Sequence, residues 1–372
     1  MDKKKIVFIT SNLSQTGGLQ MVTANLANEF AKKYKYNIDI INLGIKYGDE
    51  KYELNPNINV KYVGIDNSNC KNKFDLIKNL INSYIRLKNY IKLNCKNKNQ
   101  VIIGMGTGVS YLLPYIYNKK NNTIIGTQHN PVRHTKLMDI FRKITIAKMD
   151  HYVVLDKDTK IDMEINCKLK DIKIIPNPLT IKVDEKSKLD SKIVLAVGRL
   201  TKQKGFDLLL ESWKIVSSKH NDWNLVIVGE GEEYESLNNK IKNIGIEESV
   251  SIKPFTRDIQ QYYKNSSIFV LSSRYEGFGL VVLEAQAFGI TVVAFNCPTG
   301  PRNIINDGID GYLVEAENID KLAKQIIMLI KDKNIRTKVG ENAIKNIEKF
   351  KIENIMKQWN SLIIDLIEIN TN

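Results

Sequence analysis

The chain has 372 residues, of which 43% are hydrophobic and 26% are charged, a composition ordinary for a globular protein. It excludes a fibrous or intrinsically disordered chain, and the length favours two domains over one. The net charge of +14 comes from the first half. Residues 1–186 contain 31 Lys and Arg against 17 Asp and Glu, whereas residues 187–372 contain 24 of each. Such a field attracts acidic substrates, anionic lipid or nucleic acid.

The four cysteines are scattered, and no two have the spacing of a zinc or redox motif. They are Cys70, Cys95, Cys167 and Cys297. The first apolar stretch, Ile6 to Ile9, is too short for the core of a signal peptide. No run approaches the roughly 18 apolar residues that span a bilayer. We therefore expect a protein of the reducing cytoplasm.

Short apolar runs alternate with helical patterns through the first half, which predicts a parallel, doubly wound sheet. Strands are expected at Lys5–Thr10, Asn37–Asn42, Val60–Gly64, Val101–Met105, Thr123–Gly126 and His151–Leu155. Helices are expected at Leu19–Lys33 and Phe74–Leu93, and after Gly126 as far as about Lys148.

The pattern starts again after a short strand at Lys173–Ile175, because Pro176-Asn177-Pro178 breaks any regular element. The charged segment Lys182–Ser191 is expected to be a linker. Further strands are expected at Ile193–Val197, Asn224–Val228, Val250–Ile252, Ile268–Leu271 and Thr291–Ala294. Further helices are expected at Leu208–Ser217, Tyr234–Asn243, Gly279–Ala287 and Asp320–Lys331. The predicted fold is α/β, with two Rossmann-like domains in tandem facing a deep cleft. Ligands of such sheets bind at the carboxyl ends of the strands.

The strongest motif is the segment from Arg274 to Ala285, which follows a strand and opens a helix. Gly277 and Gly279 allow the backbone to approach a ligand closely. The N–H groups near Phe278 to Leu280 would face an anion, with the helix dipole behind them. Glu276 on the loop and Glu284 inside the helix can accept hydrogen bonds from hydroxyls at opposite ends of one ligand.

Two other loops follow strands in the same manner. The loop Gly198 to Gly205 carries Arg199 and Lys204, which can converge on a diphosphate. The loop before the first helix carries Gly17 and Gly18, where helix N–H groups suit a phosphate. This loop is not GxGxxG, and no acidic residue ends the second strand, so a nicotinamide cofactor is disfavoured.

Together these motifs resemble the GT-B glycosyltransferases, and most closely the retaining group called family 4. Glu276 and Glu284 match its Glu-x7-Glu signature, Leu195 to Gly205 its phosphate-binding segment, and Asn12 to Gly18 its first glycine loop. The stretch from Cys297 to Val314 matches the segment that follows. The resemblance is dense from about 173 to 330 and sparse between 40 and 120. It implies an acceptor domain at 1–182, a nucleotide-sugar domain at 183–350, and a final helix at 351–372 that returns to the first domain.

The resemblance also implies roles for the residues of these motifs. Arg199 and Lys204 would neutralise the donor diphosphate, beside the turn at Gly198. Glu276 would hold sugar hydroxyls and Glu284 the ribose hydroxyls. The remaining donor-binding positions would be Gly17, Gly18, Gly277, Phe278, Gly279 and Leu280.

His129 follows the strand Thr123–Gly126, where many members of the group have a histidine near the reacting sugar. A structural role for this histidine is the alternative. No Asp-x-Asp motif occurs, and two basic side chains with a helix dipole can replace a magnesium ion. We therefore expect no metal and no cofactor, with a UDP-sugar as donor substrate.

The segment Lys71–Lys98 is basic and amphipathic, which suits contact with an anionic membrane. The alternative is that its apolar face belongs to the core. A lipid-linked saccharide or a cell-surface polysaccharide is the expected acceptor, with the first domain peripheral on the inner face of the plasma membrane.

Three rival functions remain open at this point. The first is a sugar-nucleotide 2-epimerase or a phosphorylase on the same fold. The second is an inactive donor-binding subunit. The presence of Glu276, Arg199 and Lys204 argues against this function. The third is a basic nucleic-acid-binding protein. The sequence contains no aromatic-rich basic face or known nucleic-acid-binding motif that would support it.

Overall fold

The computed structural model describes residues 5–14, 17–45, 52–65, 73–94, 100–117, 122–132, 134–169 and 171–371. The chain divides into two compact units. Unit 1 comprises Met1–Pro178 and Glu353–Asn372, and unit 2 comprises Leu179–Ile352. The first break falls at 178/179, where the sequence suggested 182/183, and the second at 352/353, where it suggested 350/351.

Unit 1 is built on a seven-stranded sheet with the order β3-β2-β1-β4-β5-β6-β7, in which all neighbours pair in parallel. The strands are β1 (Lys5–Thr10), β2 (Asn37–Gly44), β3 (Asn59–Ile65), β4 (Gln100–Gly104), β5 (Asn122–Gln128), β6 (His151–Val154) and β7 (Ile172–Ile174). Ile6 to Ile9 of β1 are fully buried. Successive side chains of a strand point to opposite faces, so both faces of the sheet centre are covered.

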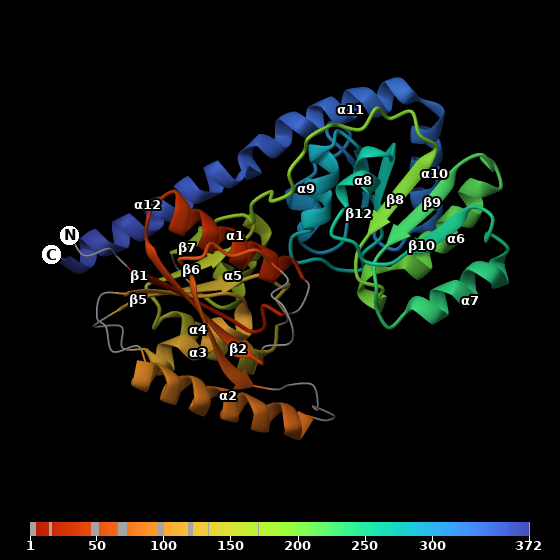
Figure 1. Ribbon diagram of the computed structural model, residues 1–372. Coiled ribbons are helices and arrows are strands. Elements are labelled where there is room, and N and C mark those ends of the chain that lie inside the picture. Colours follow the sequence, from red (N-terminus) through yellow and green to blue (C-terminus); the bar gives the residue numbers. More distant parts are fainter. Residues whose placement is uncertain are drawn as a thin grey trace. The chain divides into compact units, whose positions relative to one another are not determined.

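The helices of unit 1 are α1 (Gly18–Lys32), α2 (Lys73–Asn94), α3 (Thr107–Ile116), α4 (Lys136–Ile146), α5 (Lys157–Asn166) and α12 (Ile352–Thr371). Right-handed crossovers place α1 on one face of the sheet and α2 to α5 on the other, because the chain moves in opposite directions along the sheet. Figure 1 shows α2, α3 and α4 together on one side of the strands. The last helix belongs to unit 1 almost entirely, and the Tyr36 hydroxyl donates a hydrogen bond to Asn360 at 3.2 Å.

Helix α2 contributes to both the core and the surface. Leu87 and Ile91 are buried, whereas Ile81 and Ile85 are 54% and 47% exposed. The core alternative therefore holds for Leu87 and Ile91, whereas the membrane alternative stays a prediction for the exposed residues. Lys71, Lys96 and Lys98 lie outside the described residues, as do the side chains of Phe74, Ile77 and Leu80.

Unit 2 is built on a six-stranded parallel sheet with the order β10-β9-β8-β11-β12-β13. The strands are β8 (Ile193–Val197), β9 (Asn224–Val228), β10 (Val250–Lys253), β11 (Ile268–Leu271), β12 (Thr291–Phe295) and β13 (Tyr312–Val314). The α-helices are α6 (Phe206–Ser217), α7 (Tyr234–Ile244), α8 (Gln260–Lys264), α9 (Leu280–Ala287), α10 (Ile319–Lys331) and α11 (Lys333–Asn346). Short 3-10 helices are η1 (Lys202–Lys204), η2 (Gly300–Asn303) and η3 (Ile347–Phe350).

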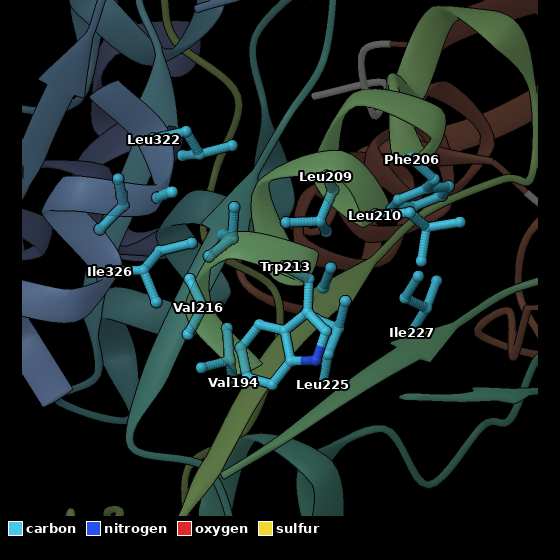
Figure 2. Packing of buried hydrophobic residues seen from close by; sticks show 14 of the residues in the cluster. Val194, Phe206, Leu209, Leu210, Trp213, Val216, Leu225, Ile227, Leu322 and Ile326 are labelled. Atoms are coloured by element: carbon cyan, nitrogen blue, oxygen red, sulfur yellow. The ribbon is translucent and has the colours of Figure 1, made fainter. Parts of the chain in front are cut away.

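The core of unit 2 is centred on the fully buried Trp213 of α6, whose indole N–H donates to the Ser249 hydroxyl at 3.0 Å (Figure 2). Side chains from the sheet, α6 and α10 surround it, among them Val194, Leu209, Val216, Leu225, Ile227, Leu322 and Ile326. Burying each such side chain contributes about 1.5–3 kcal/mol. The loop between β8 and α6 is thus anchored in the core at both ends.

The charged segment Lys182–Ser191 is not a free linker. Leu189 is 6% exposed, and its carbonyl accepts a hydrogen bond from the Arg336 guanidinium at 3.2 Å. The Ser187 N–H donates to the Phe288 carbonyl at 3.0 Å. The segment is part of unit 2, and its high charge reflects a solvated outer side. Helices α3, α5, α8 and α11 were not predicted individually; α3 contains Pro114, and α8 has only five residues.

Among the described residues, no helix is both long enough and apolar enough to cross a membrane. Cys167 and Cys297 are free, buried thiols, whereas Cys70 and Cys95 lie outside the described residues.

Candidate active site

The two strongest motifs follow β8 and β11, which are neighbours in the sheet of unit 2. The chain leaves β8 toward β9 on one side and later passes to β11 on the other. This arrangement makes the gap between β8 and β11 the topological switch point of the sheet. Ligands of doubly wound sheets bind at the carboxyl ends of the strands at such a point.

Hydrogen bonds join the loop after β8 to the loop after β11. The Arg274 N–H donates to the Gln203 carbonyl at 2.8 Å, and the Gln203 side chain donates to the Tyr275 carbonyl at 3.0 Å. Gly205 lies at the closest approach, with φ of 63°, and a Cβ there would be 2.1 Å from the Ser272 carbonyl oxygen. Only glycine fits this position, so Gly205 allows the two loops to form one rigid surface.

An ion pair lies at the centre of this surface. Lys204 Nζ is 2.6 Å from Glu276 Oε1, and the Ser273 hydroxyl donates to the same oxygen at 2.7 Å. Both side chains of the ion pair are largely buried, at 14% and 7% exposure. No donor among the described residues contacts Glu276 Oε2, which leaves that oxygen for a ligand. The structure thus brings together two side chains that are 72 positions apart.

A third loop supports Glu276 from the side of β12. The Thr299 hydroxyl donates to the Glu276 carbonyl. Thr299 has φ of 59°, a left-handed conformation that costs a non-glycine residue about 1–3 kcal/mol. Strain of this kind persists where the surrounding structure over-determines the backbone, and it clusters at functional sites.

Helix α9 begins beside this pair. Its N-terminal residue is Leu280, after Gly279 with φ of 91°, a conformation that favours glycine. The first N–H groups of a helix have no acceptor within the helix, so they can bind an anion or a hydroxyl. Gly277 is half-buried, and the Phe278 ring packs edge-on against Phe350 with centroids 5.9 Å apart. Phe278 can therefore contribute only its backbone to a ligand.

Glu284 lies one turn further along α9, and its carboxylate is held by Tyr263. The Tyr263 hydroxyl donates to Glu284 Oε2 at 2.7 Å, and its ring stacks on Phe288 at 5.4 Å. Burial raises the pKa of Glu284 above its ordinary value, and the hydrogen bond from Tyr263 and the charge of Lys204 oppose that rise. Tyr263 lies on the short helix α8, which the sequence pattern did not reveal.

Arg199 and Gly198 lie on the same loop as Lys204. The Gly198 N–H donates to the Val228 carbonyl at 3.1 Å. The Arg199 side chain is exposed and has no hydrogen bond or ion pair within the part of unit 2 that the structure describes. Its guanidinium is therefore available to an anionic ligand.

Gly17, Gly18 and His129 belong to unit 1, at the carboxyl ends of β1 and β5. Gly18 begins α1, and the Gly17 N–H donates to the Tyr52 hydroxyl at 2.8 Å. Both ring nitrogens of His129 are buried without a hydrogen-bond partner among the described residues, in a small pocket shared with Trp359. Burial lowers the pKa of His129 to about 4, so the imidazole is neutral at pH 7.

One group of side chains has the composition of a metal site among the described residues, and it lies elsewhere. His134, Asp139 and Cys167 approach one another in unit 1. The Arg142 guanidinium donates to Asp139 Oδ1 at 2.6 Å, and burial raises the pKa of the Cys167 thiol to about 11. A protonated thiol and an arginine-bound carboxylate are poor metal ligands, and the group includes no predicted site residue.

Comparisons with known proteins agree with this geometry. Residues 179–346 match the sequence family "Glycosyl transferases group 1". An uncharacterized glycosyltransferase of Haemophilus influenzae is 32% identical over 97% of this chain and 100% of its own length. The amylovoran biosynthesis glycosyltransferase AmsD of Erwinia amylovora is 28% identical over 96% of this chain and 99% of its own. S. aureus TarM, solved with fondaparinux, α-GlcNAc-glycerol and UDP, aligns with a TM-score of 0.79 at 20% identity, covering 97% of this chain and 99% of that one.

The two Rossmann-like sheets and these matches define a glycosyltransferase of GT-B architecture. The chain belongs to the glycosyl transferases group 1 family, with the Lys204–Glu276 pair and the start of α9 inside the matched segment.

Proposed function

We propose that this enzyme is a metal-independent, retaining glycosyltransferase of family 4 that uses a UDP-sugar. It transfers a hexose or N-acetylhexosamine to a lipid-linked saccharide or a cell-surface polysaccharide. The observation that carries this proposal is the contact of Lys204 with Glu276 beside the start of α9. One cation, one carboxylate and a row of N–H groups there can hold a diphosphate and its sugar together.

Each residue has a distinct role in this proposal. Lys204 and the exposed Arg199 balance the charge of the diphosphate as it departs. Glu276 accepts hydrogen bonds from sugar hydroxyls through Oε2, and Glu284 accepts those of the ribose. The bond between sugar C1 and the diphosphate breaks as C1 bonds to the acceptor oxygen on the same face. The departing phosphate takes the acceptor proton. In unit 1, Gly17 and Gly18 at the start of α1 and the neutral His129 after β5 are the candidate residues for contact with the substrate.

The related enzyme of amylovoran biosynthesis supports a polysaccharide acceptor, and the UDP in the TarM complex supports the nucleotide. We place the enzyme at the inner face of the plasma membrane, where its basic unit 1 would meet anionic lipid. An epimerase or a phosphorylase on the same fold remains the rival, and the need for an acceptor separates them.

The test is the release of free nucleotide from a panel of sugar nucleotides, with and without EDTA, and the anomeric configuration of the product. We expect one UDP-sugar to be turned over at the same rate with chelator present, with the α-configuration of the donor retained. A requirement for Mg²⁺, or an inverted product, would contradict those parts of the proposal. Absence of binding to every sugar nucleotide would refute it as a whole.

The role of Glu284 predicts a pH effect on UDP affinity. Ribose hydroxyls need the carboxylate form, so affinity should fall as the pH drops through the raised pKa of Glu284. The variant Tyr263→Phe removes a hydrogen bond that favours the carboxylate, so that pKa should rise further and the affinity loss should begin at higher pH. Calorimetry of UDP binding between pH 4.5 and 8 checks this. Superimposable pH profiles for the two proteins would show that Glu284 does not bind the nucleotide.

A further inference from the structure

Helix α4 exposes its apolar side chains and buries polar ones, which is the reverse of an ordinary surface helix. Large apolar side chains point outward along its length, with exposed fractions from 39% to 78%. These are Leu137, Met138, Ile140, Phe141 and Ile144. The residues turned inward are Arg142, Thr145 and Ile146, of which two are polar. A surface helix of a globular protein normally buries its apolar stripe.

Polar contacts hold α4 in this orientation. The buried Arg142 donates through Nε to the Tyr111 hydroxyl at 3.2 Å and through Nη1 to Asp139 at 2.6 Å. Thr145 Oγ1 lies 3.2 Å from the Tyr115 hydroxyl. Turning the apolar side inward would break these bonds, and each buried polar group left without a partner costs about 1–3 kcal/mol. The outward apolar side is therefore a stable feature of the fold.

The apolar surface continues onto the neighbouring helices. The Tyr84 hydroxyl donates to the Tyr115 carbonyl at 3.2 Å, which links α2 to α3, and the contact of Tyr115 with Thr145 links α3 to α4. Ile81 and Ile85 on α2 are exposed, as is Tyr115 on α3. We call the exposed apolar side chains of α2, α3 and α4 the apolar helical face. Figure 1 shows these three helices side by side in unit 1. Exposed apolar side chains gathered on adjacent helices are a feature of binding surfaces.

The charges around the apolar helical face are mainly positive. Lys136 and Lys143 flank the apolar side of α4, whose sole acidic residue, Asp139, is held by Arg142 and His134. Lys148 lies 4.3 Å from the centre of the Tyr115 ring. The described side chains of α2 add exposed basic groups at Lys78, Arg86, Lys88 and Lys92. Apolar side chains bordered by lysines suit an anionic lipid surface. Lysine is depleted in protein–protein interfaces, so the same border disfavours a second protein as the occupant.

We propose that the apolar helical face docks on the surface of an anionic lipid bilayer, with the apolar side chains of α4 inserted between the headgroups. This inference rests on the proposed function, because a lipid-linked acceptor would be presented there. It extends the sequence hypothesis, which based docking on the segment Lys71–Lys98, to include α4.

The test is sedimentation of the purified full-length protein with vesicles of phosphatidylcholine, alone or mixed with phosphatidylglycerol. We expect binding to the mixed vesicles that weakens with added salt, and little binding to the neutral ones. Ile140→Asp should lower the partition coefficient at least about tenfold, because it replaces an inserted side chain with a charge. The double variant Lys136→Gln with Lys143→Gln should also lower the partition coefficient, by at most about fivefold for each lysine removed. The matched control is Ile309→Asp in unit 2, since Ile309 and Ile140 are 58% and 57% exposed.

Equal binding of wild type to both kinds of vesicle, or an undiminished binding of Ile140→Asp, would overturn the proposal. So would a dimer in light scattering that Ile140→Asp dissociates, without vesicle binding by the wild type, because the occupant would then be a second copy. Release of nucleotide from a water-soluble UDP-sugar is measured in parallel and should be the same in all these variants. A wild-type protein that turns over donor but binds neither kind of vesicle would refute docking alone, whereas a wild-type protein that binds the mixed vesicles without any turnover would refute the proposed function alone.

Discussion

Replacing Lys204 by alanine is expected to lower kcat/KM for donor turnover by about 10²- to 10³-fold, the range seen when a preorganised electrostatic contact to the developing charge is removed. The ammonium lies on a loop anchored by α6, and Glu276 fixes its position at 2.6 Å. It can therefore meet the leaving diphosphate without reorganisation. Because UDP carries the same diphosphate, the Kd of UDP should rise as well, which calorimetry can measure.

Lys202→Ala is the matched control for this variant. Lys202 belongs to the same 3-10 helix, but its side chain is exposed, and its contact with Arg274 is made through its carbonyl oxygen. Turnover of this control should stay within about twofold of wild type, as is usual for surface substitutions. Similar losses in both variants would mean that the loop is merely sensitive to its net charge, and would remove Lys204 from its proposed role.

The central strands and the motif loops were predictable because two strong local signals coincide there. Strands β8, β9 and β11 have the residue ranges predicted for them, since short, continuous apolar runs bounded by turn residues are typical of buried parallel strands. The loops after β8 and β11 could then be assigned to one edge of a parallel sheet.

The partners that position the glutamates were not predictable. Ser273 contacts Glu276 within one loop, but the contacts of Tyr263 with Glu284 and of Thr299 with Glu276 depend on how a five-residue helix and a second loop meet this segment. Hydrophobic periodicity in a single sequence does not predict such tertiary contacts. The backbone strain at Thr299 could not be predicted either, because threonine rarely adopts a positive φ and its residue type gives no sign of one.

The orientation of α4 shows a further limit of sequence patterns. Periodicity indicates that a helix has an apolar side, but it does not say whether that side faces the protein. The outward direction follows from Arg142, whose partners Tyr111 and Asp139 become apparent only in the folded unit. The basic, amphipathic pattern directed the membrane hypothesis to α2, and it could not tell that Leu87 and Ile91 of this helix pack into the core.

Glu276→Gln should separate sugar recognition from nucleotide binding, and it is the second large effect that we expect. The variant keeps the size of the side chain and an oxygen for the Ser273 hydroxyl, and it removes the charge that would grip the sugar. Hydrogen bonds to a charged group contribute about 1.5–3 kcal/mol each, so losing two such bonds to sugar hydroxyls should lower turnover by 10²-fold or more. The Kd of UDP, which has no sugar, should change by less than about threefold.

Glu315→Gln provides the control. Glu315 pairs with Lys321 at 2.7 Å but is 59% exposed, so the Glu315→Gln variant should turn over donor at the wild-type rate.

The double variant Lys204→Ala with Glu276→Gln adds a sharper criterion. If the two side chains act on one transition state, their effects should be far from additive, since residues in direct contact couple. Additive losses, or a Glu276→Gln variant that loses UDP affinity as strongly as turnover, would mean that Glu276 only holds Lys204 in place. The sugar would then have to be recognised by other groups, of which the N–H groups at the start of α9 are the nearest.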